Sequence, residues 1–339
     1  MIQRVFVFFI AMTCCALAEA REPAATSEHF AFYNEFETNL NDALIAAGVE
    51  RNFGREELFQ SGVEQACFEA LAPSLQTGWN LAVAYYSEII APFNFDDRQQ
   101  ALIRTQLSGY ADYSDDERDG LFVELAGSFR DAAAPAYRAC HWKAQHAANQ
   151  RWIDAIMLQL ARFEQPIAAR LAELYQLSWS QRRLDIDIVS TVSWAGANSL
   201  FSDQDKGHIL ISSALQEPEA LELVFHEASH GFMLRPSPLQ DALNTAADNL
   251  GVPVPDGLWH VLLFVTTGES VRQAVVSSGA PDYDPMIVEI YGRSQWGSYA
   301  NAVGEVWPRY LNGELTAVEA ASEVISKIRQ AATKQSSAQ

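Results

Sequence analysis

Apolar residues recur at helical spacing through the first half of the chain and at strand spacing only near its middle. Residues 28–178 have a mostly helical pattern, and helices are predicted over 29–49, 65–90, 121–138 and 139–177. Pro166 is expected to kink or divide the last of them, because proline cannot donate a helical backbone hydrogen bond. The pattern therefore predicts a helical N-terminal region over residues 21–183.

The strand-like pattern begins at Leu184. Residues 184–189 alternate apolar and acidic side chains, which is typical of a half-exposed strand, and residues 207–213 predict a second strand. The residues between them, 194–206, are rich in turn formers and predict a loop. Pro218 suits the first turn of the helix that follows.

Further helices are predicted over 239–250 and 257–277, and helical segments continue to about residue 332. The predicted fold class is α+β and predominantly helical. A helical N-terminal half precedes a strand–strand–helix core and more C-terminal helices, in a second region over 184–333. Residues 21–27 and 334–339 are small and polar, and we expect them to be disordered.

Composition limits the possible partners. The chain has 339 residues, 49% of them hydrophobic, which is enough for a large core in one domain or two. Its formal net charge is −20, which argues against nucleic acid and against anionic membrane surfaces as partners. The charge indicates little about a substrate, and the oligomeric state stays open.

The first 20 residues have the features of a secretory signal peptide. Arg4 supplies a positive start, residues 5–18 form a short apolar stretch, and Ala18-Glu19-Ala20 has the small-x-small form of a cleavage site. We expect cleavage after Ala20 and a secreted or periplasmic mature protein. An uncleaved membrane anchor is the alternative; no later apolar run is long enough to span a bilayer.

Two cysteines remain after such cleavage, Cys67 and Cys140. In an oxidising compartment they predict one disulfide, and the alternative is a pair of buried free thiols. The sequence alone leaves open whether the two cysteines meet in the fold.

Residues 226–230 carry the most specific chemical signal, the sequence His-Glu-Ala-Ser-His after an apolar run that suits a helix. Residues four apart lie on one face of a helix, so His226 and His230 could hold one metal ion. Glu227 would lie close enough to act as a general base on water polarised by that metal. This pattern predicts a Zn²⁺ site. The alternative is a surface helix with two solvated histidines.

This motif, with Gly268-Glu269 on a later helix, resembles the zinc metallopeptidases of the zincin clan, and its gluzincin branch in particular. The resemblance covers about residues 184–275 and implies Glu269 as the third zinc ligand. It also implies that the strand over 207–213 is a sheet edge that binds the substrate backbone. The Met and Pro at positions 233 and 236 do not fit the metzincin branch.

His260 competes with Glu269 for the role of third ligand. The two residues are nine apart, which is about half a turn out of phase on a regular helix, so only one of them can face the metal. If Glu269 is the ligand, His260 could stabilise the oxyanion from the start of the helix or could simply be packed. Asp241 and Asp248 are weaker alternatives.

Polar groups that would assist the site are also predicted. Asp241, Asp248 and Asp256 are candidates to accept the free ring N–H of a ligating histidine. Tyr299 is a candidate oxyanion donor because it lies in a Gly- and Ser-flanked loop, and Tyr291 and Tyr310 are alternatives. The alternative for each tyrosine is a place in the core, and the sequence favours that alternative.

The sequence therefore predicts an exported zinc metallohydrolase that acts on a peptide or protein substrate, with Glu227 as the general base. Two alternatives are a zinc-binding interaction protein whose site is covered by the helical half, and a zinc hydrolase of non-peptide amides.

Overall fold

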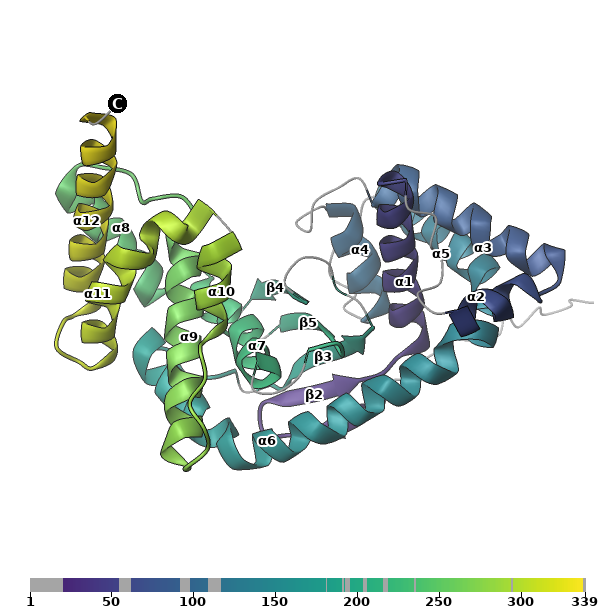
Figure 1. Ribbon diagram of the computed structural model, residues 1–339, viewed down its shortest axis with the longest axis horizontal. Coiled ribbons are helices and arrows are strands. Elements are labelled where there is room, and N and C mark those ends of the chain that lie inside the picture. The colour runs from purple at the N-terminus through teal and green to yellow at the C-terminus, as the bar shows by residue number, and fades with distance from the viewer. Residues whose placement is uncertain are drawn as a thin grey trace, which may run out of the picture.

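A small five-stranded sheet lies between two groups of helices in this α+β, mostly helical chain (Figure 1). The computed structural model describes residues 21–337 except 55–61, 92–97, 109–116, 181, 191, 193–195, 204–205, 216–218, 235 and 294. The predicted signal peptide lies outside these described residues. Among them, no helix combines the length and the apolar character needed to cross a membrane.

The sheet has the strand order β1-β2-β3-β5-β4. The three inner strands β2, β3 and β5 run parallel to one another, while β1 and β4 pair antiparallel at the two edges. The strands are β1 (Ala25–Thr26), β2 (Phe30–Tyr33), β3 (Leu184–Val189), β4 (Ala197–Asp203) and β5 (Lys206–Ser212). The first two strands come from the start of the chain, so the sheet joins the two predicted regions.

Three sequence predictions fail at this sheet. Residues 30–33 were predicted as helix but form β2, because a fully buried strand has no polar face to reveal a two-residue period. Residues 197–203 lie in the predicted loop but form edge strand β4. The strand over 207–213, realised as β5, is consequently interior, and the predicted sheet edge on it is wrong.

The helices of the N-terminal region form a core of their own, which Figure 1 shows at one end of the molecule. They are α1 (Phe36–Asn52), α2 (Gly62–Glu69), α3 (Pro73–Tyr85), α4 (Arg98–Leu107) and α5 (Glu117–Tyr137), with a π-helical turn η1 (Tyr86–Ile90) after α3. A second π-helical turn, η2 (Arg138–Trp142), leads into α6 (Lys143–Tyr175), which runs through Pro166 without dividing.

The predicted disulfide is confirmed. Cys67 on α2 and Cys140 in η2 are bonded, with an S–S distance of 2.06 Å across a sequence separation of 73 residues. The bridge closes a loop that contains most of the N-terminal helices, so it constrains this core and not the later part of the chain.

Both faces of the sheet are covered. Ile186 and Ile209 belong to the apolar core that includes α6 and the helices after the sheet. On the other face, Asp187 is fully buried, accepting from Arg21 at 2.5 Å and lying 2.6 Å from His208. The strand predicted over 184–189 is present as β3, but its predicted half-exposure is wrong, because ionic partners allow Asp187 to be buried. Arg21 makes this ion pair and residues 25–26 form β1, so the prediction that residues 21–27 are disordered is also wrong.

The chain after the sheet is helical. Its elements are α7 (Glu219–Ser229), the 3-10 turn η3 (His230–Met233), α8 (Pro238–Leu250), α9 (Leu258–Ser277), α10 (Met286–Arg293), the 3-10 turn η4 (Gln295–Tyr299), α11 (Ala300–Leu311) and α12 (Ala317–Ser337). Helix α9 packs against both α6 and α7. Because α12 reaches Ser337, residues 334–337 of the predicted disordered tail are helical.

Candidate metal centre

Helix α7 carries the histidine motif through the core of the protein. Every residue from Ala220 to Ser229 is buried, since α7 packs between the sheet and α9. His226 and Glu227 are only 1% and 5% exposed, and His230 follows at the start of η3. A surface helix with two solvated histidines is therefore excluded.

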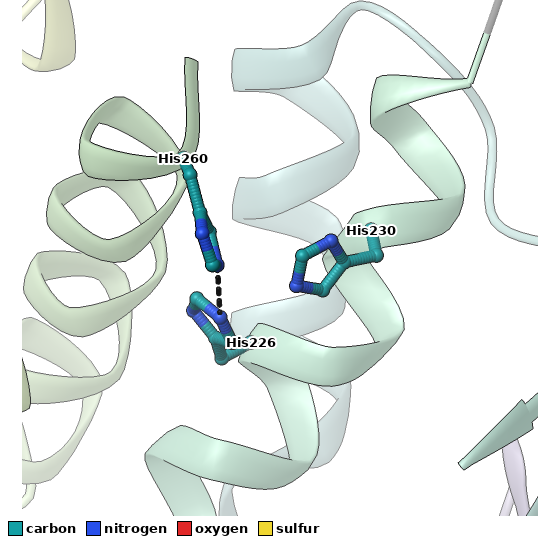
Figure 2. A group of neighbouring side chains, drawn as sticks. All are labelled: His226, His230 and His260. Atoms are coloured by element: carbon teal, nitrogen blue, oxygen red, sulfur yellow. Dashed lines mark hydrogen bonds between the residues drawn. The ribbon is translucent and has the colours of Figure 1, made fainter. Parts of the chain in front are cut away.

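The third histidine comes from the first turn of α9. Figure 2 shows His260 pointing at His226, with His230 beside them on the next helical turn after His226. The Nε2 atoms of His226 and His260 lie 3.2 Å apart. Among the described residues, one ligand atom from each of the three histidines can be chosen so that all lie within 4.8 Å of one another. The three could hold a metal ion.

Burial keeps these histidines neutral. It lowers the pKa of His226 well below its ordinary value, that of His230 to about 3 and that of His260 to about 4; neighbouring imidazoles add to the effect on the first two. A neutral imidazole has a nitrogen lone pair free to bind a metal. The same burial therefore leaves the three donors ready at neutral pH.

Glu227 lies one residue from His226 in the same buried environment. Burial raises the pKa of its carboxyl to about 7, and a hydrogen bond with Ser199 on β4 acts in the opposite direction. A carboxyl with a pKa near neutrality can both accept and return a proton. Glu227 is thus buried, as is His226, and its carboxyl bonds Ser199 on the sheet side of α7.

Aromatic rings enclose the three histidines. Phe264 stacks on His226 with ring centroids 3.7 Å apart, Trp259 stacks on His260 at 4.9 Å, and Trp296 meets His260 edge-on at 5.1 Å. No described residue forms a hydrogen bond with the buried Nδ1 atom of His226. Its ring is oriented by stacking, and not by the carboxylate that we expected.

The prediction of Glu269 as third ligand is corrected by the structure. Its carboxylate accepts two hydrogen bonds from Arg272, each of 2.7 Å, and another from Gln273. The helical phase explains this, because nine residues separate it from His260, so the two side chains leave α9 on different sides. His260, the predicted competitor, is the residue that joins His226 and His230.

Gly268, the other half of the Gly-Glu pair, has a packing role. A Cβ atom at this position would lie 2.7 Å from an Oε of Glu222, so only glycine leaves room for that carboxylate between α7 and α9. Glu222 is fully buried and accepts hydrogen bonds from the backbone N–H of Met286 and the hydroxyl of Tyr283. Sequence reasoning passed over Glu222, although it was a lone carboxylate in an apolar run.

The predicted assisting groups lie elsewhere. Asp241, Asp248 and Asp256 are exposed and outside the histidine cluster. Tyr299 donates a 3.0 Å hydrogen bond to the backbone oxygen of Asp256. Tyr310 donates to the backbone oxygen of Leu174 and belongs to the core.

The aromatic contacts of the site were not predicted from the sequence. Trp259 was adjacent to His260 in the chain and gave a weak signal. Trp296 gave none, because it is 36 residues beyond His260 and only the fold brings the two together.

The chain matches no protein-family model, no curated protein and no solved structure in the comparisons made.

Proposed function

We propose that the protein is an exported zinc metallohydrolase that cleaves peptide bonds. The observation that carries the proposal is the convergence of His226, His230 and His260, with the buried Glu227 next to His226 in the sequence of α7. Three protein ligands, an open coordination position and an adjacent base are the usual components of a catalytic zinc site.

The donor set suits zinc. Two imidazole nitrogens bound at about 2.0–2.1 Å to one tetrahedral Zn²⁺ lie about 3.4 Å apart. The Nε2 atoms of His226 and His260 are 3.2 Å apart, close to that spacing. Three neutral nitrogen ligands favour zinc over magnesium or calcium, which prefer oxygen ligands.

Each residue has a role in this proposal. When bound, zinc would supply a Lewis acid that polarises both water and the substrate carbonyl. The three histidines would hold the ion, one from α7, one from the turn η3 that follows it and one from α9. Glu227 accepts a proton from the attacking water and returns it to the leaving nitrogen, so that its carboxylate is regenerated.

A zincin-like core remains part of the proposal, supported by the motif helix that follows strand β5 against a mixed sheet. The histidine third ligand departs from the gluzincin pattern. Among the described strands β4 lies at the edge of the sheet and β5 does not, so the proposed site for an extended substrate backbone moves to β4. Ser199 on this strand also bonds Glu227, which joins the edge to the general base.

The burial of the site favours one other function. With Glu227 only 5% exposed, access of a polypeptide to the base is restricted in this conformation. The second candidate is therefore a zinc-binding interaction protein with a covered site, and a hydrolase of small non-peptide amides is a variant of the first.

Elemental analysis combined with a peptide-library assay distinguishes these functions. The proposal predicts about one zinc per chain and peptide cleavage that stops on chelation and returns with zinc. Zinc without turnover of any peptide would favour the interaction protein or the hydrolase of small amides. Protein that neither contains nor takes up zinc would contradict all three.

A further inference from the structure

His260 occupies a part of α9 that is weakly stabilised by its own helix. It lies in the first turn, and the N-cap residue Gly257 makes no side-chain capping bond. The capping bond of a serine or aspartate at this position typically contributes about 1 kcal/mol, and first turns without one fray readily. A ligand in such a turn needs support from elsewhere in the fold.

The 3-10 turn η4 provides the first part of that support through Trp296. The indole meets the His260 ring edge-on, while Trp259 stacks on the same ring at an interplanar angle of 16°. Trp296 also lies directly against Gly257, since a Cβ atom there would be 2.4 Å from the indole Nε1. His260 is therefore in contact with two indoles, one of them from η4.

Tyr299 provides the second part from the same turn. Its hydroxyl donates a hydrogen bond of 3.0 Å to the backbone oxygen of Asp256, the residue before Gly257. Two side chains of η4 thus contact Asp256 and Gly257, which lead into α9, and His260 in its first turn.

The turn η4 is itself connected to the helix that bears the other two histidines. It packs against α10, and the first residue of α10, Met286, donates its backbone N–H to the buried carboxylate of Glu222 on α7 at 3.0 and 3.2 Å. Through α10 and Glu222, the turn that contacts His260 is therefore connected to α7, the helix that carries His226.

We propose that η4 acts as a clamp that fixes His260 relative to His226 and His230, with Trp296 and Tyr299 as positioning residues of the metal site. The inference rests on the proposed function, in that it assumes these three histidines bind zinc. It assigns Tyr299 a role different from the predicted oxyanion donor. Its phenol acts through the backbone of the α9 N-terminus and not on the substrate.

The affinity of the site for zinc, measured by competition with a chromophoric chelator, tests the clamp without any turnover assay. Trp296→Ala should weaken zinc binding by about 10- to 100-fold, the range found when groups that orient metal ligands are removed. It should also change the visible absorption spectrum of the Co²⁺-substituted protein, which reports ligand geometry. Trp296→Phe should recover part of both, because a smaller ring remains against His260.

Trp142→Ala is the matched control. Trp142 packs on Phe36 and Tyr137 in the N-terminal helices, so this variant should lose unfolding stability without a change in zinc affinity or in the Co²⁺ spectrum. Tyr299→Phe removes a single hydroxyl, which leaves the fold intact, and should weaken zinc binding about threefold or more.

Either of two results would overturn the clamp. In the first, the Trp296→Ala protein binds zinc within twofold of the wild type and its Co²⁺ spectrum is unchanged. In the second, the Tyr299→Phe protein loses turnover while its zinc affinity is unaltered. If the wild-type protein binds no zinc, the proposed function itself has failed, and that result is seen before any variant is made.

Discussion

The buried carboxyl of Glu222 gives a prediction that needs neither metal nor substrate. Burial raises its pKa to about 8, while the bonds from Met286 and Tyr283 act in the opposite direction. The folded pKa lies above the ordinary value of 4.5, so the folded protein holds this proton more tightly than the unfolded chain does. The stability associated with the proton is complete below pH 4.5 and is lost as the pH rises towards 8.

The size of the effect follows from the shift. One pKa unit corresponds to about 1.4 kcal/mol, so the wild type should lose on the order of 4 kcal/mol of unfolding free energy between pH 5 and pH 8.5 through Glu222 alone. Glu222→Gln keeps the shape and an acceptor for Met286 but cannot ionise. The variant should therefore show a smaller loss over this interval than the wild type by that amount.

The assay is urea unfolding of both zinc-free proteins at pH 5 and pH 8.5. Comparing the change in each protein cancels the contributions of other titrating groups that the two share. Equal losses of stability in the wild type and in Glu222→Gln would refute the reasoning, because they would show that Glu222 titrates alike in the folded and unfolded states.

Three further predictions concern the base, the disulfide and a close helix contact. Glu227→Gln should retain zinc and lose hydrolysis by about 100-fold or more, since the amide cannot accept a proton; steady-state turnover within tenfold of wild type would exclude this residue as the base. The double variant Cys67→Ser/Cys140→Ser should lose about 4 kcal/mol of unfolding free energy in the chain-entropy treatment of its loop, measured by urea unfolding, and should bind zinc as the wild type does. Gly268→Ala should destabilise the protein by about 1–3 kcal/mol through overpacking, whereas Gly304→Ala, with open space around its Cβ position, should stabilise it by up to about 1 kcal/mol; equal effects in thermal unfolding would contradict the assigned contact.

Local patterns predicted the parts of the structure that depend on local chemistry. The strand over 184–189, the helix over 239–250 and the helix over 257–277 all appear within a residue or so of their predicted bounds. Amphipathic periods, a proline at a helix start and a glycine after a helix end specify such elements with little help from the rest of the chain.

The sheet required information that is distant in sequence. Phe30 and Phe32 alternate with small or aromatic residues and become a strand only because Leu184 and its neighbours pair with them, about 150 residues later. Asp187 is acceptable in the core only because His208 and Arg21 meet it there. Neither pairing has a signature in a local window.

For the candidate site, too, local sequence predicted one part, and the other part depended on the fold. The motif predicted His226, Glu227 and His230, and the structure groups its two histidines with His260. Helical phase required a choice between His260 and Glu269. The family resemblance then favoured Glu269, whereas the structure pairs that carboxylate with Arg272. The deciding quantity was the rotation of α9 about its axis, which is set by packing against α6 and α7 and not by the residues of α9 alone.

The most direct test of the account is the zinc content of four single-alanine variants after equilibrium dialysis against limiting zinc. The account predicts about one zinc per chain in the wild type and in Glu269→Ala, and severe loss in His226→Ala, His230→Ala and His260→Ala. Retention of zinc by His260→Ala with its loss from Glu269→Ala would contradict the three-histidine centre and restore the carboxylate as third ligand.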